Sequence, residues 1–193
     1  KSEKNPELCR EVLQGIPLRL VINSESKFSN EVILRKQLWE ETLSTKPEWI
    51  LALDADEVLE EKFQDEIKQM LNDPGIDAYY FRLYDFWDEN HYRDDIYWKA
   101  HTHHTPFLMR YCHEIHYEWN ETSQHCGRLP KTIQHLPRKT SPLRIKHYGW
   151  AKPEDRLAKY DRYQQLDPKA KYGCKEQYDS ILDENPHLVA WED

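Results

Sequence analysis

No apolar run in this chain approaches the roughly 20 residues that span a bilayer as a helix, and no signal-peptide pattern opens it. Positive charge is also scarce: 27 Lys and Arg stand against 35 Asp and Glu, which gives a net charge of −8. No basic stretch or RNA-binding motif offsets that balance. We therefore expect no transmembrane segment, no nucleic-acid partner and a cytoplasmic location.

Cysteine is sparse as well. The chain has four, and none has the C-x-x-C spacing of a zinc or redox site: Cys9, Cys112, Cys126 and Cys174. Four cysteines are few for a small domain held together by disulfides. We therefore expect reduced thiols and no metal site built on cysteine.

Histidine is more plentiful, with 10 residues, and several lie between positions 101 and 116. The segment His113-Glu114-Ile115-His116 is one residue short of the H-E-x-x-H motif of zinc proteases. Its two imidazoles would not share a helix face, and on a strand they would point to opposite faces. We interpret these histidines as polar residues of a half-exposed β region.

The segment 49–59 is the part of the sequence that points most directly to chemistry. Its apolar start, 49–53, is too short for a buried helix and predicts a strand covered on both faces. Asp54, Asp56 and Glu57 follow at once, so the strand would deliver acids to the carboxyl edge of a sheet, where open α/β folds bind ligands. Carboxylates there attract a hard cation, which attracts phosphates. The alternative is a polar turn that leads into the next helix.

Apolar spacing elsewhere predicts alternating helices and strands. Helical spacing is found at 7–14, 29–45, 59–71 and 153–167. Strand patterns are found at 16–22, 78–84, 107–111, 115–119 and 143–147. The segments 85–105 and 125–142 have no clean period, and the first is long enough to be a lid or a binding loop.

Two motifs, in this order, resemble family 2 glycosyltransferases with the GT-A fold. Leu53-Asp54-Ala55-Asp56-Glu57 looks like the Asp-x-Asp segment of these enzymes. Lys146-His147-Tyr148-Gly149-Trp150 and the helical segment after it resemble their late histidine and the helix that follows it. Together the motifs and the elements between them cover roughly residues 15 to 170.

The resemblance implies an α/β fold: a GT-A-like (Rossmann-like), mainly parallel sheet flanked by helices, with a small antiparallel region. We expect a single glycosyltransferase-like domain over 1–193, because a chain of 193 residues can bury one sizeable core. Its last part, 172–193, would be a C-terminal tail with a short helix at 175–182. The resemblance also implies a strand-helix-strand before Lys1, so we expect the chain to be N-terminally incomplete.

The implied activity is metal-dependent, inverting transfer of a sugar from a nucleotide-sugar donor, most simply a UDP-sugar, to a hydroxyl of a glycan or other acceptor. Mn²⁺ or Mg²⁺ would be the cofactor, with Asp56 as first ligand and His147 and Asp54 as further ligands. Asp54 would also contact the donor ribose, and Glu57 would support the turn. Arg35 would face the donor nucleotide. The alternatives are a solvated Arg35 paired with a nearby Glu and a plain hydrogen-bonding role for His147.

An inverting transfer also needs a base that takes the acceptor proton. Glu121 fits best by its distance before His147, and Glu118 is the reserve. Three tryptophans are predicted to stack on an acceptor sugar or to pack in the core: Trp87, Trp98 and Trp119. Two other functions stay open, a non-catalytic carbohydrate- or nucleotide-binding module on the same fold and a metal-dependent hydrolase.

Overall fold

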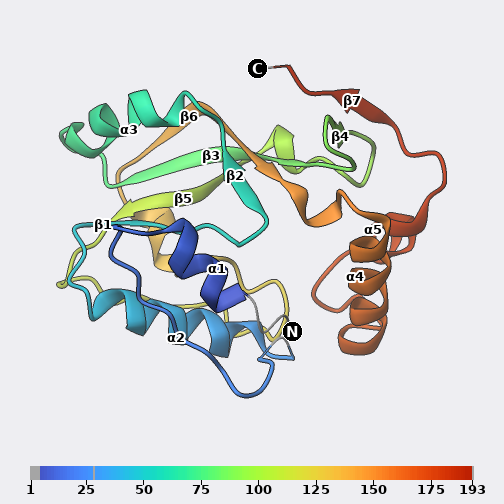
Figure 1. The fold of residues 1–193 in the computed structure, drawn as a ribbon, viewed down its shortest axis with the longest axis horizontal. Coiled ribbons are helices and arrows are strands. Elements are labelled where there is room, and N and C mark those ends of the chain that lie inside the picture. The colour runs from blue at the N-terminus through green and yellow to red at the C-terminus, as the bar shows by residue number, and fades with distance from the viewer. Residues whose placement is uncertain (1–4, 28, 193) are drawn as a thin grey trace.

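A five-stranded mixed sheet forms the centre of the protein in the computed structural model, which describes residues 5–27 and 29–192 (Figure 1). Its strands, in spatial order, are β1 (Trp49–Leu51), β5 (His104–Arg110), β3 (Ala78–Asp85), β6 (Arg138–His147) and β2 (Glu57–Leu59). Only β3 and β6 pair in parallel, and the other three pairs are antiparallel. The α/β class is confirmed, but the prediction of a mainly parallel sheet is wrong, because β5 and β2 run against their neighbours.

The strand directions nevertheless bring three carboxyl ends to one edge. Since β5 is antiparallel to both β1 and β3, and β3 is parallel to β6, the strands β1, β3 and β6 all run the same way. The register of β2 against β6 places Glu57 opposite His147. The acidic turn after β1 therefore lies beside the end of β6, although about 90 residues separate them in sequence.

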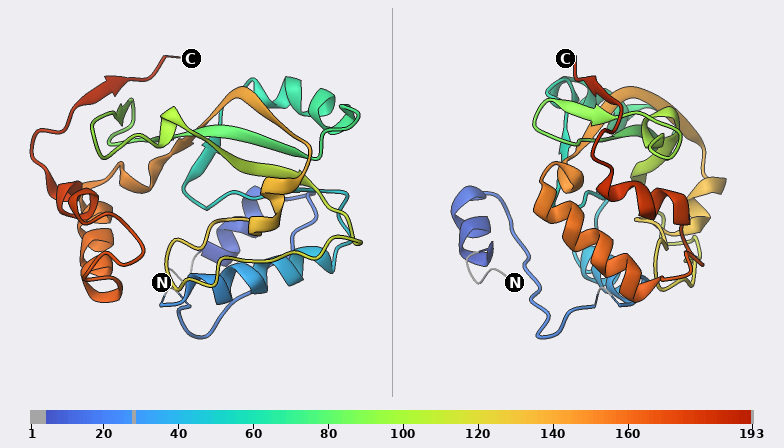
Figure 2. Two further views of the ribbon diagram at one scale, coloured as in Figure 1. Left: turned by 180° about the vertical axis from the view of Figure 1, so that it is seen from behind. Right: turned by 90° about the vertical axis from the view of Figure 1, so that its right-hand side faces the viewer.

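Helices cover both faces of the sheet and one end of it. The α-helices are α1 (Asn5–Val12), α2 (Glu31–Leu43), α3 (Phe63–Asn72), α4 (Pro153–Leu166) and α5 (Lys175–Asp179). Short 3-10 helices are η1 (Ala100–Thr102), η2 (Lys131–His135), η3 (Tyr148–Trp150) and η4 (Ser180–Leu182). Figure 2 shows α4 and α5 together at one end of the sheet and α1 standing apart from it.

The two sheet faces have separate apolar cores, as alternation along a strand requires. Ala78 of β3 and Met109 of β5 pack with α2 in one core, whereas their chain neighbours Tyr79 and Leu108 pack with α3 in the other. All four side chains are buried. The sheet is thus held between α2 and α3, and its position fixes the edge that carries the acids.

Three predicted elements differ from the structure. The segment 16–22 contains no strand, and Ile16 and Ile22 are exposed, because none of the described strands pairs with it. The segment 115–119 is irregular, since the Glu118 N–H donates to the Thr132 hydroxyl at 2.8 Å rather than to a strand. The helix predicted from Leu59 begins later, at Phe63, because Leu59 pairs in β2.

Other predictions hold. Helices lie where helical spacing predicted them, at α1, α2 and α4, and strands β3, β5 and β6 include or largely cover three predicted strands. The short helix expected in the tail is present as α5 and η4. Part of the segment 85–105 is ordered as β4 (His91–Arg93), which pairs with β7 (Leu188–Ala190) of the tail. In the described part of the chain no helix is both long and apolar enough to cross a membrane.

Candidate functional site

Asp54 is held by Arg35 of α2 through two hydrogen bonds. The two guanidinium nitrogens donate to the two carboxylate oxygens at 2.6 and 2.9 Å. Burial acts to raise the pKa of Asp54, but the hydrogen bonds from Arg35 outweigh it and hold the pKa below its usual range. The interpretation of Arg35 as a solvated residue paired with a nearby Glu is wrong, since its partner is Asp54.

Glu57 supports the acidic turn from within, as the sequence predicted. Its side chain is only 2% exposed, and it accepts the Asp54 N–H at 2.8 Å. Arg128 donates to both Glu57 oxygens, at 2.6 and 2.7 Å, and stacks on the Phe107 ring with 3.9 Å between the guanidinium carbon and the ring centroid. A buried carboxylate needs such a partner, so this pair fixes the backbone that positions Asp54.

Replacing Arg128 should therefore destabilise the protein strongly. We expect Arg128→Ala to lower the free energy of unfolding by about 3–5 kcal/mol, because Glu57 would be left buried without its partner. Urea denaturation measures this change. The matched control is Lys131→Ala, which removes the partner of exposed Glu118 and should cost about 1 kcal/mol or less. An equal, small effect of both substitutions would contradict the structural role of Arg128.

Asp56, His147 and Asp85 form a connected row across three strand ends. His147, at the end of β6, lies with its Nε2 3.5 Å from Asp56 Oδ2. Its Nδ1 donates to Asp85 Oδ1, at the end of β3, at 2.7 Å. The backbone ties the same ends together, because the Tyr148 N–H donates to the Asp56 carbonyl at 2.8 Å. The imidazole is therefore fixed with Nε2 facing Asp56.

Lys159 and Gly149 complete this group. Lys159, on α4, places its ammonium 3.5 Å from Asp56 Oδ2 and 4.2 Å from the centroid of the Trp150 ring. Gly149 in η3 lies so close that an added Cβ would stand 2.5 Å from His147 Nε2 and closer still to the Lys159 ammonium and Asp56 Oδ2. The polar atoms of three residues thus converge at a position that only glycine leaves open.

The ionisation of the group follows from these contacts. Interaction with His147 holds the pKa of Asp56 well below its usual range. Burial acts to lower the pKa of His147, but hydrogen bonds to Asp56 and Asp85 outweigh it and raise the pKa to about 9. Burial lowers the pKa of Lys159, and attraction to Asp56 offsets only part of this. At neutral pH His147 is therefore an imidazolium between two carboxylates.

This arrangement predicts a pH-dependent stability in the presence of a chelator. A His147 pKa raised from 6.5 to about 9 gives a stabilisation that is complete below about pH 6.5 and is lost as the pH rises through 9. We expect a loss of roughly 3 kcal/mol at most in unfolding free energy, measured by urea titration from pH 6 to pH 10. His147→Gln, which keeps Asp56, Asp85 and Lys159, should flatten this profile. The same slope in wild type and variant would contradict the assignment.

Asp56 and His147 are close enough to share the divalent cation that the sequence analysis expects, but that cation would have to replace the proton on His147 Nε2. Two ligands about 2.1 Å from one ion lie at most about 4.2 Å apart, and Asp56 Oδ2 and His147 Nε2 are 3.5 Å apart. Asp85 on the other ring nitrogen is the usual support of a metal-bound imidazole. Asp54, the third expected metal ligand, is bound through both carboxylate oxygens to Arg35. Within 5–27 and 29–192 no group of three or more His, Cys, Asp or Glu side chains is arranged to hold a metal.

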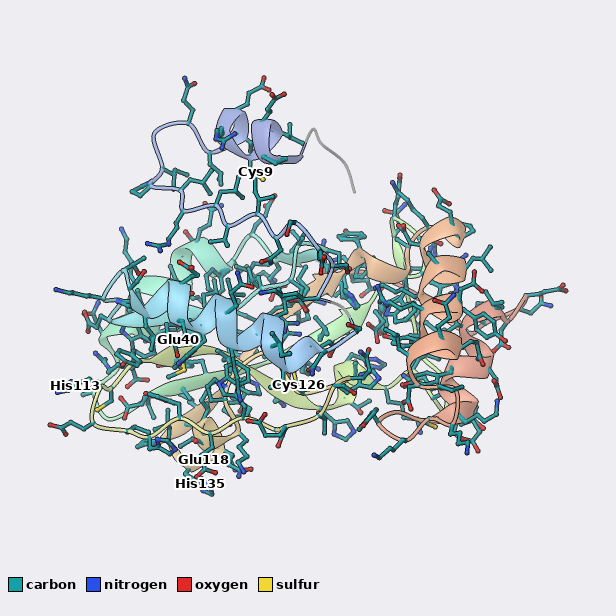
Figure 3. The ribbon with its side chains drawn as sticks, turned by 90° about the horizontal axis from the view of Figure 1, so that it is seen from below. Cys9, Glu40, His113, Glu118, Cys126 and His135 are labelled. Atoms are coloured by element: carbon teal, nitrogen blue, oxygen red, sulfur yellow. The ribbon has the colours of Figure 1, made fainter. Side chains whose placement is uncertain are left out.

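The two expected bases lie in different surroundings. Glu121 is 65% exposed and pairs at 2.6 Å with Lys36, the neighbour of Arg35 on α2. Glu118 pairs with Lys131 at 3.0 Å and lines a separate surface pocket of about 340 Å³. Figure 3 shows Glu118 beside His135, which lines the same pocket. Of the two, Glu121 is the one connected to the helix that holds Asp54.

The three tryptophans are buried in the core, and His113 of the His113–His116 segment lies far from α4 (Figure 3). Trp87, Trp98 and Trp119 are all buried, at 5%, 2% and 7% exposure, in apolar clusters. Their rings are thus part of the core and not of an open acceptor surface. His113 lies at the end of the molecule opposite α4, the helix that carries Lys159 (Figure 3).

Comparisons of the chain with protein-family models, with curated proteins and with solved structures found no match. The site therefore rests on its own geometry. Sequence reasoning missed the parts played by four residues: Asp85, Arg128, Gly149 and Lys159. Asp85 directly follows the predicted strand 78–84, and Gly149 and Lys159 lie within the second motif, so local signals existed for these three. Arg128 lies in an irregular basic segment and had no such signal.

Proposed function

We propose that this protein is a metal-dependent glycosyltransferase that moves a sugar from a nucleotide-sugar donor to a hydroxyl of a glycan or other acceptor. The observation that carries the proposal is the group formed by Asp56, His147 and Lys159, where β1 and β6 end on one sheet edge. Such edges are where open α/β sheets bind ligands. The mixed sheet, with β1, β3 and β6 alike and β5 and β2 opposed, is compatible with an α/β fold.

The donor would lie between two parts of this edge. Asp56 and His147 would hold the divalent ion, and Asp54, kept in place by Arg35, would face the ribose. Bound Mn²⁺ or Mg²⁺ would supply Lewis-acid neutralisation of the diphosphate as it leaves. Two protein ligands suit a cation whose remaining ligands are phosphate oxygens and water. A UDP-sugar is the donor with which we begin.

The transfer requires an acceptor oxygen, a base and a leaving group. The acceptor hydroxyl oxygen forms a bond to the sugar C1 while the bond from C1 to the phosphate oxygen breaks, and the nucleoside diphosphate leaves with that electron pair. The hydroxyl proton passes to a carboxylate, for which we propose Glu121, with Glu118 as the reserve. Attack opposite to the leaving group inverts the configuration at C1.

The test is a melting-temperature panel of nucleoside diphosphates, each with and without Mn²⁺. A ligand that binds only the folded state at 100 times its dissociation constant stabilises the protein by about 2.7 kcal/mol. We expect one nucleoside diphosphate, UDP first, to raise the melting temperature only when Mn²⁺ is present. Transfer from the matching nucleotide-sugar, followed by NMR of the product anomer, then identifies an inverting enzyme.

The same panel separates the alternatives. A binding module would bind a nucleotide in a metal-dependent way but would neither transfer the sugar to an acceptor nor hydrolyse the donor. Stabilisation by Mn²⁺ with no further effect of any nucleotide would instead favour a hydrolase. If neither metal nor nucleotide shifts the melting temperature, the proposed function is wrong.

A further inference from the structure

The ammonium group of Lys159 occupies the position beside Asp56 where the proposed function places a metal ion. Its ammonium lies 3.5 Å from Asp56 Oδ2, and its side chain is only 17% exposed. Within the described residues, Asp56 is the one carboxylate that forms an ion pair with this ammonium. A divalent ion that binds Asp56 through Oδ2 therefore competes with the lysine for that oxygen.

The Lys159 ammonium has a second interaction partner next to Asp56. It lies 4.2 Å from the Trp150 ring centroid, within the range of a cation–π contact. Gly149 leaves no side chain between Lys159, Asp56 and His147. The ammonium can thus leave Asp56 without leaving the site, because the ring continues to hold it near the position of the incoming ion.

Charge then decides what has to accompany the metal. With the metal alone, a divalent ion and the displaced ammonium would repel each other at close range with no added negative charge. A diphosphate supplies that negative charge, and a lysine is a common phosphate partner. The metal and the nucleotide should therefore bind together, with the lysine transferred from a carboxylate to a phosphate.

We propose that Lys159 is a donor-binding residue that occupies Asp56 in the ligand-free protein and exchanges this carboxylate for the donor diphosphate when the divalent cation binds. This inference rests on the proposed function. It adds the prediction that Mn²⁺ binds weakly by itself and that a nucleoside diphosphate makes its binding tighter. Lys159 would thus make metal binding conditional on the donor.

The test measures Mn²⁺ binding by electron paramagnetic resonance, and UDP binding by calorimetry, each with and without the other ligand. In wild type we expect UDP to tighten Mn²⁺ binding by roughly tenfold or more, a usual size for coupling between two ligands. In Lys159→Met we expect Mn²⁺ alone to bind roughly fivefold more tightly, because Lys159 no longer competes for Asp56. The coupling to UDP should fall by roughly threefold or more, and the part that comes from direct contact of the metal with the phosphates should remain. Lys159→Arg, which keeps the charge, should restore most of the coupling.

Lys146→Met is the matched control. It removes an ammonium that is also stacked on a tryptophan, 4.7 Å from the Trp191 ring centroid, and should leave both titrations unchanged. If UDP tightens Mn²⁺ binding equally in wild type and in Lys159→Met, the role of Lys159 is wrong and the proposed function still stands. Wild-type protein that binds UDP equally well without Mn²⁺, or does not bind it, would contradict the proposed function and this inference together.

Discussion

Asp56→Asn should leave the protein folded and remove the metal-dependent nucleotide binding that the proposed function requires. The substitution keeps the size of the side chain but takes away the charge that faces His147 and Lys159. Neutral Asn holds a hard cation less strongly, so the leaving diphosphate would lose its counter-ion where charge stabilisation is often the largest catalytic effect. We expect at least a roughly hundredfold loss of nucleotide affinity with Mn²⁺ and of transfer rate, about 2.7 kcal/mol.

Nucleotide titrations with and without Mn²⁺, together with a melting curve, measure this result. Asp73→Asn is the matched control. Asp73 also accepts a lysine, Lys139 at 3.0 Å, but it lies near the first residues of β3 and β6 and thus at the other edge of the sheet. The Asp73→Asn protein should bind nucleotide with the affinity of wild type. Wild-type transfer in Asp56→Asn would rule out the metal role, and a polar turn would be the remaining interpretation.

Gly149→Ala should be as damaging to binding, for a steric reason. The added methyl group would lie 2.5 Å from His147 Nε2 and closer to Lys159 and Asp56, distances that real Cβ atoms essentially never show. The three polar groups have to move apart, so the two proposed ligands would no longer be 3.5 Å from each other. We expect a loss of Mn²⁺-dependent nucleotide affinity of roughly a hundredfold and a loss of about 1–3 kcal/mol in stability.

Calorimetric titration and urea denaturation of the same samples separate the two effects. Ala151→Ser adds one heavy atom two residues further along the chain and serves as the control, with expected binding close to that of wild type. If Gly149→Ala binds Mn²⁺ and UDP normally, the convergence of these polar atoms has no part in ligand binding. Unfolding without loss of affinity in the folded fraction would lead to the same conclusion.

Local patterns in the sequence were sufficient to locate the two motifs. The short apolar strand before Asp54 and the alternating strand before His147 each end in a turn of polar residues. The first of them, β1, is however an edge strand with Leu51 exposed and is not covered on both faces as predicted. Pro153 and the acids after it begin α4 where expected. These signals depend on neighbouring residues and located each strand end by itself. The expectation that Asp56 and His147 lie together came from the family resemblance.

The sheet pattern could not be derived in the same way. Alternation identifies a strand but not its partner or direction, so β5 was predicted as a strand without its antiparallel place between β1 and β3. The segment 16–22 has the residue types of a strand but makes no ladder within the described residues. A strand exists only where another segment supplies hydrogen bonds, and that condition is set by distant parts of the chain.

The inner contacts of the site depend on folding in the same sense. Asp85 meets His147 across 62 positions, Arg128 meets Glu57 across 71, and Lys159 meets Asp56 across 103. The first depends on the register of β3 against β6, the second on where an irregular segment crosses β2, and the third on where α4 packs. Neighbouring residues encode none of these. The sequence therefore determined that Asp54, Asp56 and His147 follow the ends of strands, because apolar runs and turns are local. Which side chains neutralise, orient and compete for them was decided by packing, because charges interact according to distance in space and not along the chain.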